Sequence, residues 1–418
     1  MLSLFRIKDK FFYGWVITIA GLIILTIGNG TRYSFGVFFK SIESEFGLTR
    51  GATSGVFSVY MLLCCVITVL GGWALDRYGP RILGLLMGAL TGLSLLLNSQ
   101  VNSLWQLFIS YSLLLSLGTG AIYPMINSTV SRWFDKKRGL ALGIASSGGP
   151  LGVVVMSPFA TYLITSFDWR MAFIVMGLIA WVLMASLSML LRKEPGDMGL
   201  LPDGASEAAE VRPQNKGNDI QLTGLSLLQG FRTRSFWFMG LVQLFFSLNV
   251  HLILTHTVPH AIDIGISPMD AAVILSLIGG ISIFGRLVVG SVSDVLGRKP
   301  LAYTCIILQA GALISLIWAQ DLWMFYLFAV VFGFSWGGLG ILIMALVGDV
   351  FGMRNIGAIM GTLNVGWSLG AAVGPAMGGF MFDASGSYVT VFAIGAVTTL
   401  TAILFVALIR NETHTESS

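Results

Sequence analysis

The stretch Gly71–Arg81, GGWALDRYGPR, recurs later in the chain as Val289–Lys299, VGSVSDVLGRK. Asp76 of the first copy maps onto Asp294 of the second at an offset of 218 residues (294 minus 76), and the same offset superimposes several glycines elsewhere without a gap. Both copies follow an apolar stretch, and this pattern is typical of a charged turn at a membrane surface. The repeat predicts two related halves, an architecture in which a transported substrate binds between them.

The amino-acid composition indicates a membrane protein, and it does so along the whole chain. Of the 418 residues, 55% are hydrophobic and only 11% are charged, whereas water-soluble proteins carry about 25% charged residues. Apolar stretches of about 20 residues recur along the chain, as expected of an all-α protein that crosses the bilayer many times. Twelve membrane helices are predicted, at residues 12–40, 51–75, 81–99, 104–131, 138–165, 170–191, 232–262, 269–293, 300–319, 322–349, 355–382 and 387–410.

These helices define the predicted domains. Residues 1–191 form an N-terminal six-helix half, and residues 232–410 form a C-terminal one. Residues 192–231 are rich in glycine, proline and polar side chains and are interpreted as a linker, with a short interfacial helix near residues 222–231. Residues 411–418 are expected to be a disordered tail.

The distribution of basic residues predicts the orientation. Of the 24 lysines and arginines, Lys40, Arg50 and Arg170 lie at one end of the predicted helices, Arg32 and Arg286 lie within spans, and the rest gather at the other end. Basic residues favour the cytoplasmic side of a membrane. Both termini and the linker are therefore expected in the cytoplasm, and the chain in a plasma membrane, such as a bacterial inner membrane.

Arg286 lies in the apolar run of residues 271–292. Asp294, in the charged turn, follows eight positions later, so Arg286 lies about 12 Å from that turn along the helix axis. A cation at that depth costs about 2.5–3.5 kcal/mol on insertion scales. Ser282 and Gly290 hold the positions one turn away, so its own helix offers no acid. This pattern favours a water-filled cavity that receives an anion, and the alternative is a bond to carbonyls or to an acid on another helix.

Other polar residues are candidates for the same cavity. Tyr123 lies nine residues before Arg132, at a depth like that of Arg286, and Asn127 shares its helix face. Each is a candidate substrate ligand, with aromatic packing and an inter-helix hydrogen bond as the alternatives. His256 is a candidate for substrate binding or proton coupling, because histidine titrates near neutral pH.

Arg32 is the second cation within a predicted span. It either extends to the membrane interface or lines a vestibule that attracts anions, and in the second case a dianion becomes a possible substrate. The three cysteines, Cys64, Cys65 and Cys305, also fall within spans. Their spacing predicts neither a disulfide framework nor a metal site, and no cofactor or nucleic-acid partner is expected.

The repeated turn, at residues 72–81 and 290–299, resembles the hallmark loop of the major facilitator superfamily. In that interpretation Asp76, Arg77, Asp294 and Arg298 belong to a gate at the cytoplasmic ends of the helices. Residues 132–143, RWFDKKRGLALG, resemble the fifth-helix signature of monocarboxylate transporters and their bacterial oxalate/formate-antiporter-like relatives. Tyr13-Gly14-Trp15 resembles their first-helix signature.

The resemblance implies a major facilitator fold and secondary transport of a small monocarboxylate, such as lactate or pyruvate, by alternating access. Arg286 occupies the position at which that family has its carboxylate-binding arginine. Its guanidinium group would donate a hydrogen bond to each of the two carboxylate oxygens. The expected partners are the carboxylate anion, a proton and the lipid bilayer, and the expected functional unit is a monomer.

Departures from the family keep alternatives open. Proton-coupled members carry an aspartate where Ser282 stands and a first-helix lysine where Tyr33 stands. Oxalate exchangers carry a lysine in the eleventh helix, where residues 355–382 have none. Proton symport is the favoured coupling, and exchange of organic anions is the alternative. A carboxylate sensor without transport also fits. An enzyme is not expected, because no acid pair or metal cluster lies at membrane depth, and an ATP-driven pump would need a phosphate-binding loop that is missing.

Overall fold

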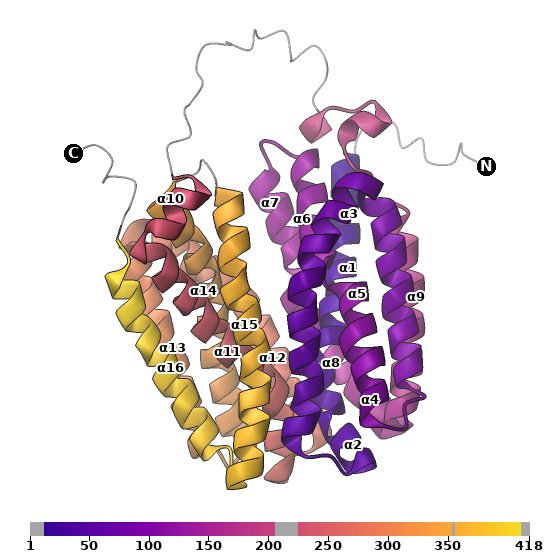
Figure 1. Cartoon of the computed structure of the whole chain (residues 1–418), viewed down its shortest axis with the longest axis vertical. Coiled ribbons are helices and arrows are strands. Elements are labelled where there is room, and N and C mark those ends of the chain that lie inside the picture. Colours follow the sequence, from indigo (N-terminus) through magenta and orange to yellow (C-terminus); the bar gives the residue numbers. More distant parts are fainter. Residues whose placement is uncertain (1–11, 205–224, 353–355, 411–418) are drawn as a thin grey trace.

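The computed structural model describes residues 12–204, 225–352 and 356–410, which fold into helices and their connections without a β-strand. Two helical bundles stand side by side, one from each half of the chain (Figure 1). Eleven helices of the described chain are long and apolar enough to cross a membrane. The predicted all-α fold in two bundles is thereby confirmed.

The N-terminal half contains the following elements: α1 (Tyr13–Tyr33), α2 (Phe35–Phe46), α3 (Arg50–Asn98), α4 (Leu104–Leu107), the π-helix η1 (Phe108–Leu114), α5 (Leu115–Thr119), α6 (Ile122–Trp133), α7 (Arg138–Ser146), α8 (Gly148–Ser166) and α9 (Trp169–Ser188). The C-terminal half contains α11 (Arg234–Asp263), α12 (Pro268–Leu296), α13 (Arg298–Ile317), α14 (Leu322–Phe351), α15 (Ile356–Ser385) and α16 (Val389–Leu408). The linker contributes two short 3-10 helices, η2 (Pro195–Met198) and η3 (Pro202–Gly204), and α10 (Leu227–Arg232).

The difference between eleven spans and twelve predicted helices arises in α3. Gly79 adopts a φ of 76° inside α3, next to Pro80, so that the element is two helices joined at a sharp kink. Gly297, its counterpart in the repeat, has a φ of 85° and separates α12 from α13. Only glycine adopts this left-handed conformation without strain, which explains the glycine at this position in both copies of the turn.

The described ends of the linker lie at one face of the molecule, which we term the linker face. The second end is held to the C-terminal half by a hydrogen bond from the Leu225 N–H to the Phe351 carbonyl, and the first end is held to the N-terminal half. The Trp133 indole donates a hydrogen bond to the Arg192 carbonyl, and the Asp203 carboxylate accepts from the backbone of Asp135 and Lys136. Burial opposes ionisation of Asp203, but these hydrogen bonds outweigh it and hold the pKa of the carboxyl below its usual value. The rest of the linker, residues 205–224, and the predicted tail lie outside the described residues.

The two halves meet mainly along two helix pairs, α3 with α15 and α8 with α12, and α2 also contacts α11. Glycines bring the backbones together at both contacts, as is common between membrane helices. A side chain at Gly279 of α12 would collide with the Pro150 carbonyl of α8, and one at Gly379 of α15 would collide with the Arg50 carbonyl of α3. The face opposite the linker is termed the far face below.

Close helix packing within the C-terminal half gives a prediction about stability. A Cβ atom at Gly337 of α14 would lie 1.9 Å from the Ser282 carbonyl oxygen of α12. Gly337→Ala is therefore expected to force the two helices apart and to lower the free energy of unfolding by about 1–3 kcal/mol. Thermal unfolding in detergent measures the loss. Gly311→Ala is the control, because nothing lies within 4 Å of that position, and equal stability of the two variants would contradict the prediction.

Candidate central site

Arg286 is half-buried on α12 and makes no hydrogen bond or ion pair with the side chains that the structure describes. It lies seven residues after Gly279, which packs against α8 of the other half. Seven residues are close to two helical turns, so Arg286 is on the same side of α12 and faces the N-terminal half. Among the described residues this guanidinium therefore has no fixed protein partner, and the anion site at Arg286 stays a prediction.

Tyr123 of α6 faces Arg286 from the N-terminal half. Its hydroxyl lies against Gly149 at the start of α8, where any larger side chain would collide with it. The hydroxyl is within electrostatic reach of both Arg286 and Arg32. The structure thus brings three of the predicted site residues, Tyr123, Arg286 and Arg32, around one region between the halves.

Asn127, one turn after Tyr123, is tied to the neighbouring helix. Its side-chain oxygen accepts a hydrogen bond from the Ser146 hydroxyl of α7 at 3.2 Å. This is the inter-helix bond predicted as the alternative to ligand binding. One amide group of Asn127 is thereby engaged, and its role as a substrate ligand stays a prediction.

Arg32 points into the protein. Its guanidinium lies 5.3 Å from the Tyr33 ring centroid and 5.7 Å from the Tyr60 ring centroid, and Nη2 contacts the Met61 sulfur at 2.7 Å. Its Nε is buried without a hydrogen-bond partner among the described residues. These contacts are those of an interior cation, so the interfacial interpretation of Arg32 is not supported by the structure.

The directions of α1 and α12 determine where the Arg32 and Arg286 side chains begin. Side chains of an α-helix tilt toward its N-terminus. Arg32 lies near the end of α1, which starts at the linker face, whereas Arg286 lies on α12, which starts at the far face. Because Arg32 lies nearer the far face and Arg286 nearer the linker face, their Cα–Cβ bonds tilt toward one another along the helix axes. This geometry favours one ligand between both cations.

His256 lies apart from Arg286, in the contact between α11 and α15. The ring is fully buried; Nε2 is 2.9 Å from the Pro375 carbonyl oxygen and Nδ1 is 3.0 Å from the Tyr388 hydroxyl. Because a carbonyl only accepts, Nε2 carries the proton and Nδ1 accepts from Tyr388. Ser54 of the other half lies 3.4 Å from Nε2. The predicted histidine thus belongs to the contact between the halves near the far face, and its role in coupling stays a prediction.

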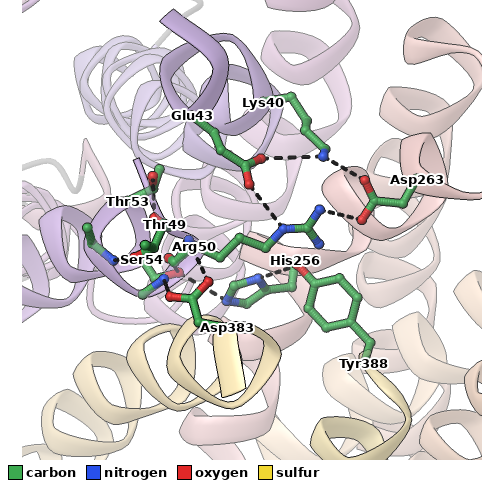
Figure 2. A network of polar contacts seen from close by, with 12 residues as sticks. Lys40, Glu43, Thr49, Arg50, Thr53, Ser54, His256, Asp263, Asp383 and Tyr388 are labelled. Carbon is green, nitrogen blue, oxygen red and sulfur yellow. Dashed lines mark hydrogen bonds and ion pairs between the residues drawn. The ribbon is translucent and has the colours of Figure 1, made fainter. Parts of the chain in front are cut away.

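A polar network that sequence spacing did not reveal joins the halves at the far face; we term it the far-face latch (Figure 2). Its charged members are Lys40 and Glu43 of α2, Arg50 of α3, Asp263 of α11 and Asp383 of α15. The contacts between the halves all have the same polarity: the N-terminal half supplies Lys40, Arg50 and the start of α3, and the C-terminal half supplies the carboxylates of Asp263 and Asp383.

Arg50 is the centre of the latch. Its guanidinium pairs with Asp263 at 2.5 Å and with Glu43 at 3.3 Å, and it lies 3.6 Å from the centroid of the Phe382 ring. Lys40 adds a second ion pair to Asp263 at 2.6 Å. Only 5% of the Arg50 surface is exposed, so its ion pairs are less screened by solvent than the partly exposed Lys40–Asp263 pair.

Asp383 approaches from the opposite direction. Its carboxylate accepts hydrogen bonds from the backbone N–H groups of Arg50 at 2.9 Å and Gly51 at 2.7 Å. These are free donors of the first turn of α3, where the helix dipole also favours a negative charge. The C-terminal half thus caps a helix of the N-terminal half.

Three of the gating residues predicted at the linker face, Asp76, Arg77 and Arg298, form their described contacts within one half. Asp76 pairs with Arg132 at 3.2 Å in the N-terminal half, and Arg298 pairs with Asp349 at 2.5 Å in the C-terminal half. Arg77 lies over the Trp73 and Tyr78 rings. The Asp294 side chain lies outside the described residues. Among described residues, ion pairs between the halves occur at the far face and not at the linker face.

Comparison with known proteins agrees with this architecture. A family model described as the Major Facilitator Superfamily matches residues 19–338 and 263–418. Monocarboxylate transporter 12 of Rattus norvegicus is 24% identical over 402 residues, covering 91% of this chain and 82% of the relative. Monocarboxylate transporter 4 of the same species is 24% identical, covering 95% and 83%.

Solved structures share the fold at low sequence identity. A D-xylose-proton symporter superimposes with a TM-score of 0.77 at 15% identity, covering 96% of this chain and 99% of the other. A bacterial homologue of the human lysosomal transporter Spinster, in an inward-facing and unoccupied conformation, superimposes with a TM-score of 0.74 at 16% identity, covering 97% of both chains.

Proposed function

Because the chain belongs to the major facilitator superfamily, we propose that it is a secondary active transporter that moves small monocarboxylates, of the lactate or pyruvate kind, by alternating access. One observation carries the proposal: Arg286 lies between the two halves within electrostatic reach of Tyr123, and its guanidinium has no hydrogen-bond or ion-pair partner among the described residues. A buried cation without a protein acid is stabilised by an anionic ligand.

The substrate would be held by complementary bonds. The Arg286 fork donates two charge-assisted hydrogen bonds to the carboxylate oxygens, and the Tyr123 hydroxyl donates a third. Arg32 raises the positive potential on the far-face side of the same region. Release of the far-face latch would then admit substrate from that face, and its closure would direct substrate to the linker face. We place the linker face in the cytoplasm of a plasma membrane, because basic residues gather there.

Proton symport is the proposed coupling, with exchange of organic anions as the alternative. Ser282 occupies the position beside Arg286 and donates to the Gly279 carbonyl, so no carboxyl group binds a proton there. His256 is the proposed proton carrier. Arg50 lies within electrostatic reach of its ring while the latch is closed. Latch opening would move this positive charge away and favour proton uptake from the far face, and closure would favour release.

His256→Ala is expected to flatten the pH dependence of uptake, because it removes the imidazole that would carry the proton. The measurement is the initial uptake rate in proteoliposomes at a series of external pH values. His260→Ala serves as the control, since this neighbouring histidine packs against the Phe325 and Phe392 rings. A pH profile equal to that of the wild type would exclude His256 from the coupling.

A counterflow screen tests the proposed function. Proteoliposomes loaded with lactate, pyruvate, formate or oxalate are assayed for uptake of the labelled acid, with and without a pH gradient. Lactate or pyruvate counterflow with gradient-driven accumulation supports symport of monocarboxylates. Strict exchange that no pH gradient drives supports an anion exchanger. Binding of a carboxylate without any flux would indicate a sensor, and neither binding nor flux would refute the proposal.

A further inference from the structure

His251 of α11 lies where the two halves meet near Arg32. The ring is 0% exposed. Tyr33 of α1, Phe57 of α3 and Trp367 of α15 surround it, with ring centroids 6.0, 6.5 and 5.5 Å away. Arg32 lies over the same Tyr33 ring and within electrostatic reach of His251. The histidine therefore borders the region that the two arginines approach.

The protonation pattern of His251 follows from its partners. Nδ1 lies 2.9 Å from the Ser247 carbonyl oxygen, which only accepts, so Nδ1 carries the proton. Nε2 of the neutral ring is then an acceptor with a free lone pair. It is buried and has no hydrogen-bond partner among the described residues. A buried polar atom without a partner is costly, so a ligand that donates a hydrogen bond to Nε2 would be stabilised there.

Two groups of opposite hydrogen-bonding character, both without a partner among the described residues, thus lie near the same Tyr33 ring: the Nε–H donor of Arg32 and the Nε2 acceptor of His251. We propose that Arg32 and His251 form a subsite that selects a 2-hydroxycarboxylate, whose carboxylate binds the arginines while its hydroxyl donates to His251. This inference rests on the proposed function, because it assumes that a carboxylate is the substrate.

Chemistry predicts the order of preference. A 2-hydroxy acid supplies both the anion and the donor. An unsubstituted acid leaves Nε2 without a partner, and a 2-oxo acid places an oxygen lone pair against it. A 2-amino acid also donates, but its ammonium group would be repelled by Arg32. A site built around one hydrogen bond to a substrate discriminates strongly against analogues that lack it, so a preference of about tenfold or more is expected.

The test compares lactate, propionate and pyruvate as counterflow substrates of the reconstituted full chain. The wild type is expected to show a half-saturating concentration for lactate about tenfold below those of the other two acids. His251→Phe keeps an aromatic ring beside Tyr33, Phe57 and Trp367 but removes the acceptor, so the preference should be lost. His251→Gln returns an acceptor near the position of Nε2 and should restore part of it.

His260→Phe is the matched control and should leave the preference unchanged. Equal half-saturating concentrations for the three acids in the wild type would overturn the inference and leave carboxylate transport intact, as would a preference that persists in His251→Phe. This wild-type comparison holds even if His251→Phe fails to fold. Failure of the wild type to exchange any of the three acids would instead refute the proposed function, and the subsite with it.

Discussion

Arg286→Lys is expected to lower the initial rate of carboxylate uptake by about a hundredfold while the protein still folds. A lysine keeps the charge but donates from a single point, so it cannot make two parallel hydrogen bonds to a carboxylate. A hundredfold loss corresponds to about 2.7 kcal/mol, within reach of lost charge-assisted bonds. Folding should persist because no described side chain depends on Arg286 for a hydrogen bond or an ion pair.

The measurement pairs uptake in proteoliposomes with thermal unfolding in detergent. Arg232→Lys is the control, since this exposed arginine at the end of α10 lies outside the central site. Uptake near the wild-type rate in Arg286→Lys would argue against the carboxylate clamp. Loss of folding together with uptake would show that Arg286 serves packing, contrary to its unpaired state.

Asp383→Asn is expected to open the far-face latch. The neutral amide keeps one oxygen acceptor but loses the charge that the α3 N-terminus and Arg50 stabilise. Charge-assisted hydrogen bonds contribute about 1.5–3 kcal/mol, so the population with the far face open should rise about tenfold or more. Uptake should fall as well, because the closed state forms less often.

Cysteine labelling from the far face measures this opening. Ser54 is fully buried behind the latch and lies beside His256. In a chain without its native cysteines, Ser54→Cys should react with an impermeant maleimide about tenfold faster when combined with Asp383→Asn. Asp321→Asn is the control, because Asp321 begins α14 without capping it. An unchanged labelling rate would mean that Asp383 does not hold the far face closed.

Much of the fold could be predicted from the sequence because the repeated turn and the apolar stretches can each be recognised within a short segment of the chain. The kinks at Gly79 and Gly297 follow from the repeated turn. Counting residues from the turns also predicts that Arg286 and Tyr123 lie at one depth, and in the structure they are within electrostatic reach of each other. Depth along a helix follows from its fixed rise per residue.

The direction of a side chain around a helix was harder to predict. One position turns an α-helix by about 100°, so Arg32 could not be assigned to the interior before its contacts with Tyr33 and Tyr60 were known. The latch was missed because Arg50 and Asp383 are 333 residues apart. The available signal was that Lys40 and Arg50 are two of only three basic residues at the far ends of the helices.

The cap that Asp383 places on α3 has a consequence for motion. Thr49 caps its own helix only through Ala52, so the amides of Arg50 and Gly51 depend on a carboxylate that departs whenever the far face opens. In the proposed cycle each turnover would expose the start of α3 to water, where frayed amides exchange their protons with solvent. The rate of deuterium uptake at these two amides would therefore report how often the far face opens during the transport cycle.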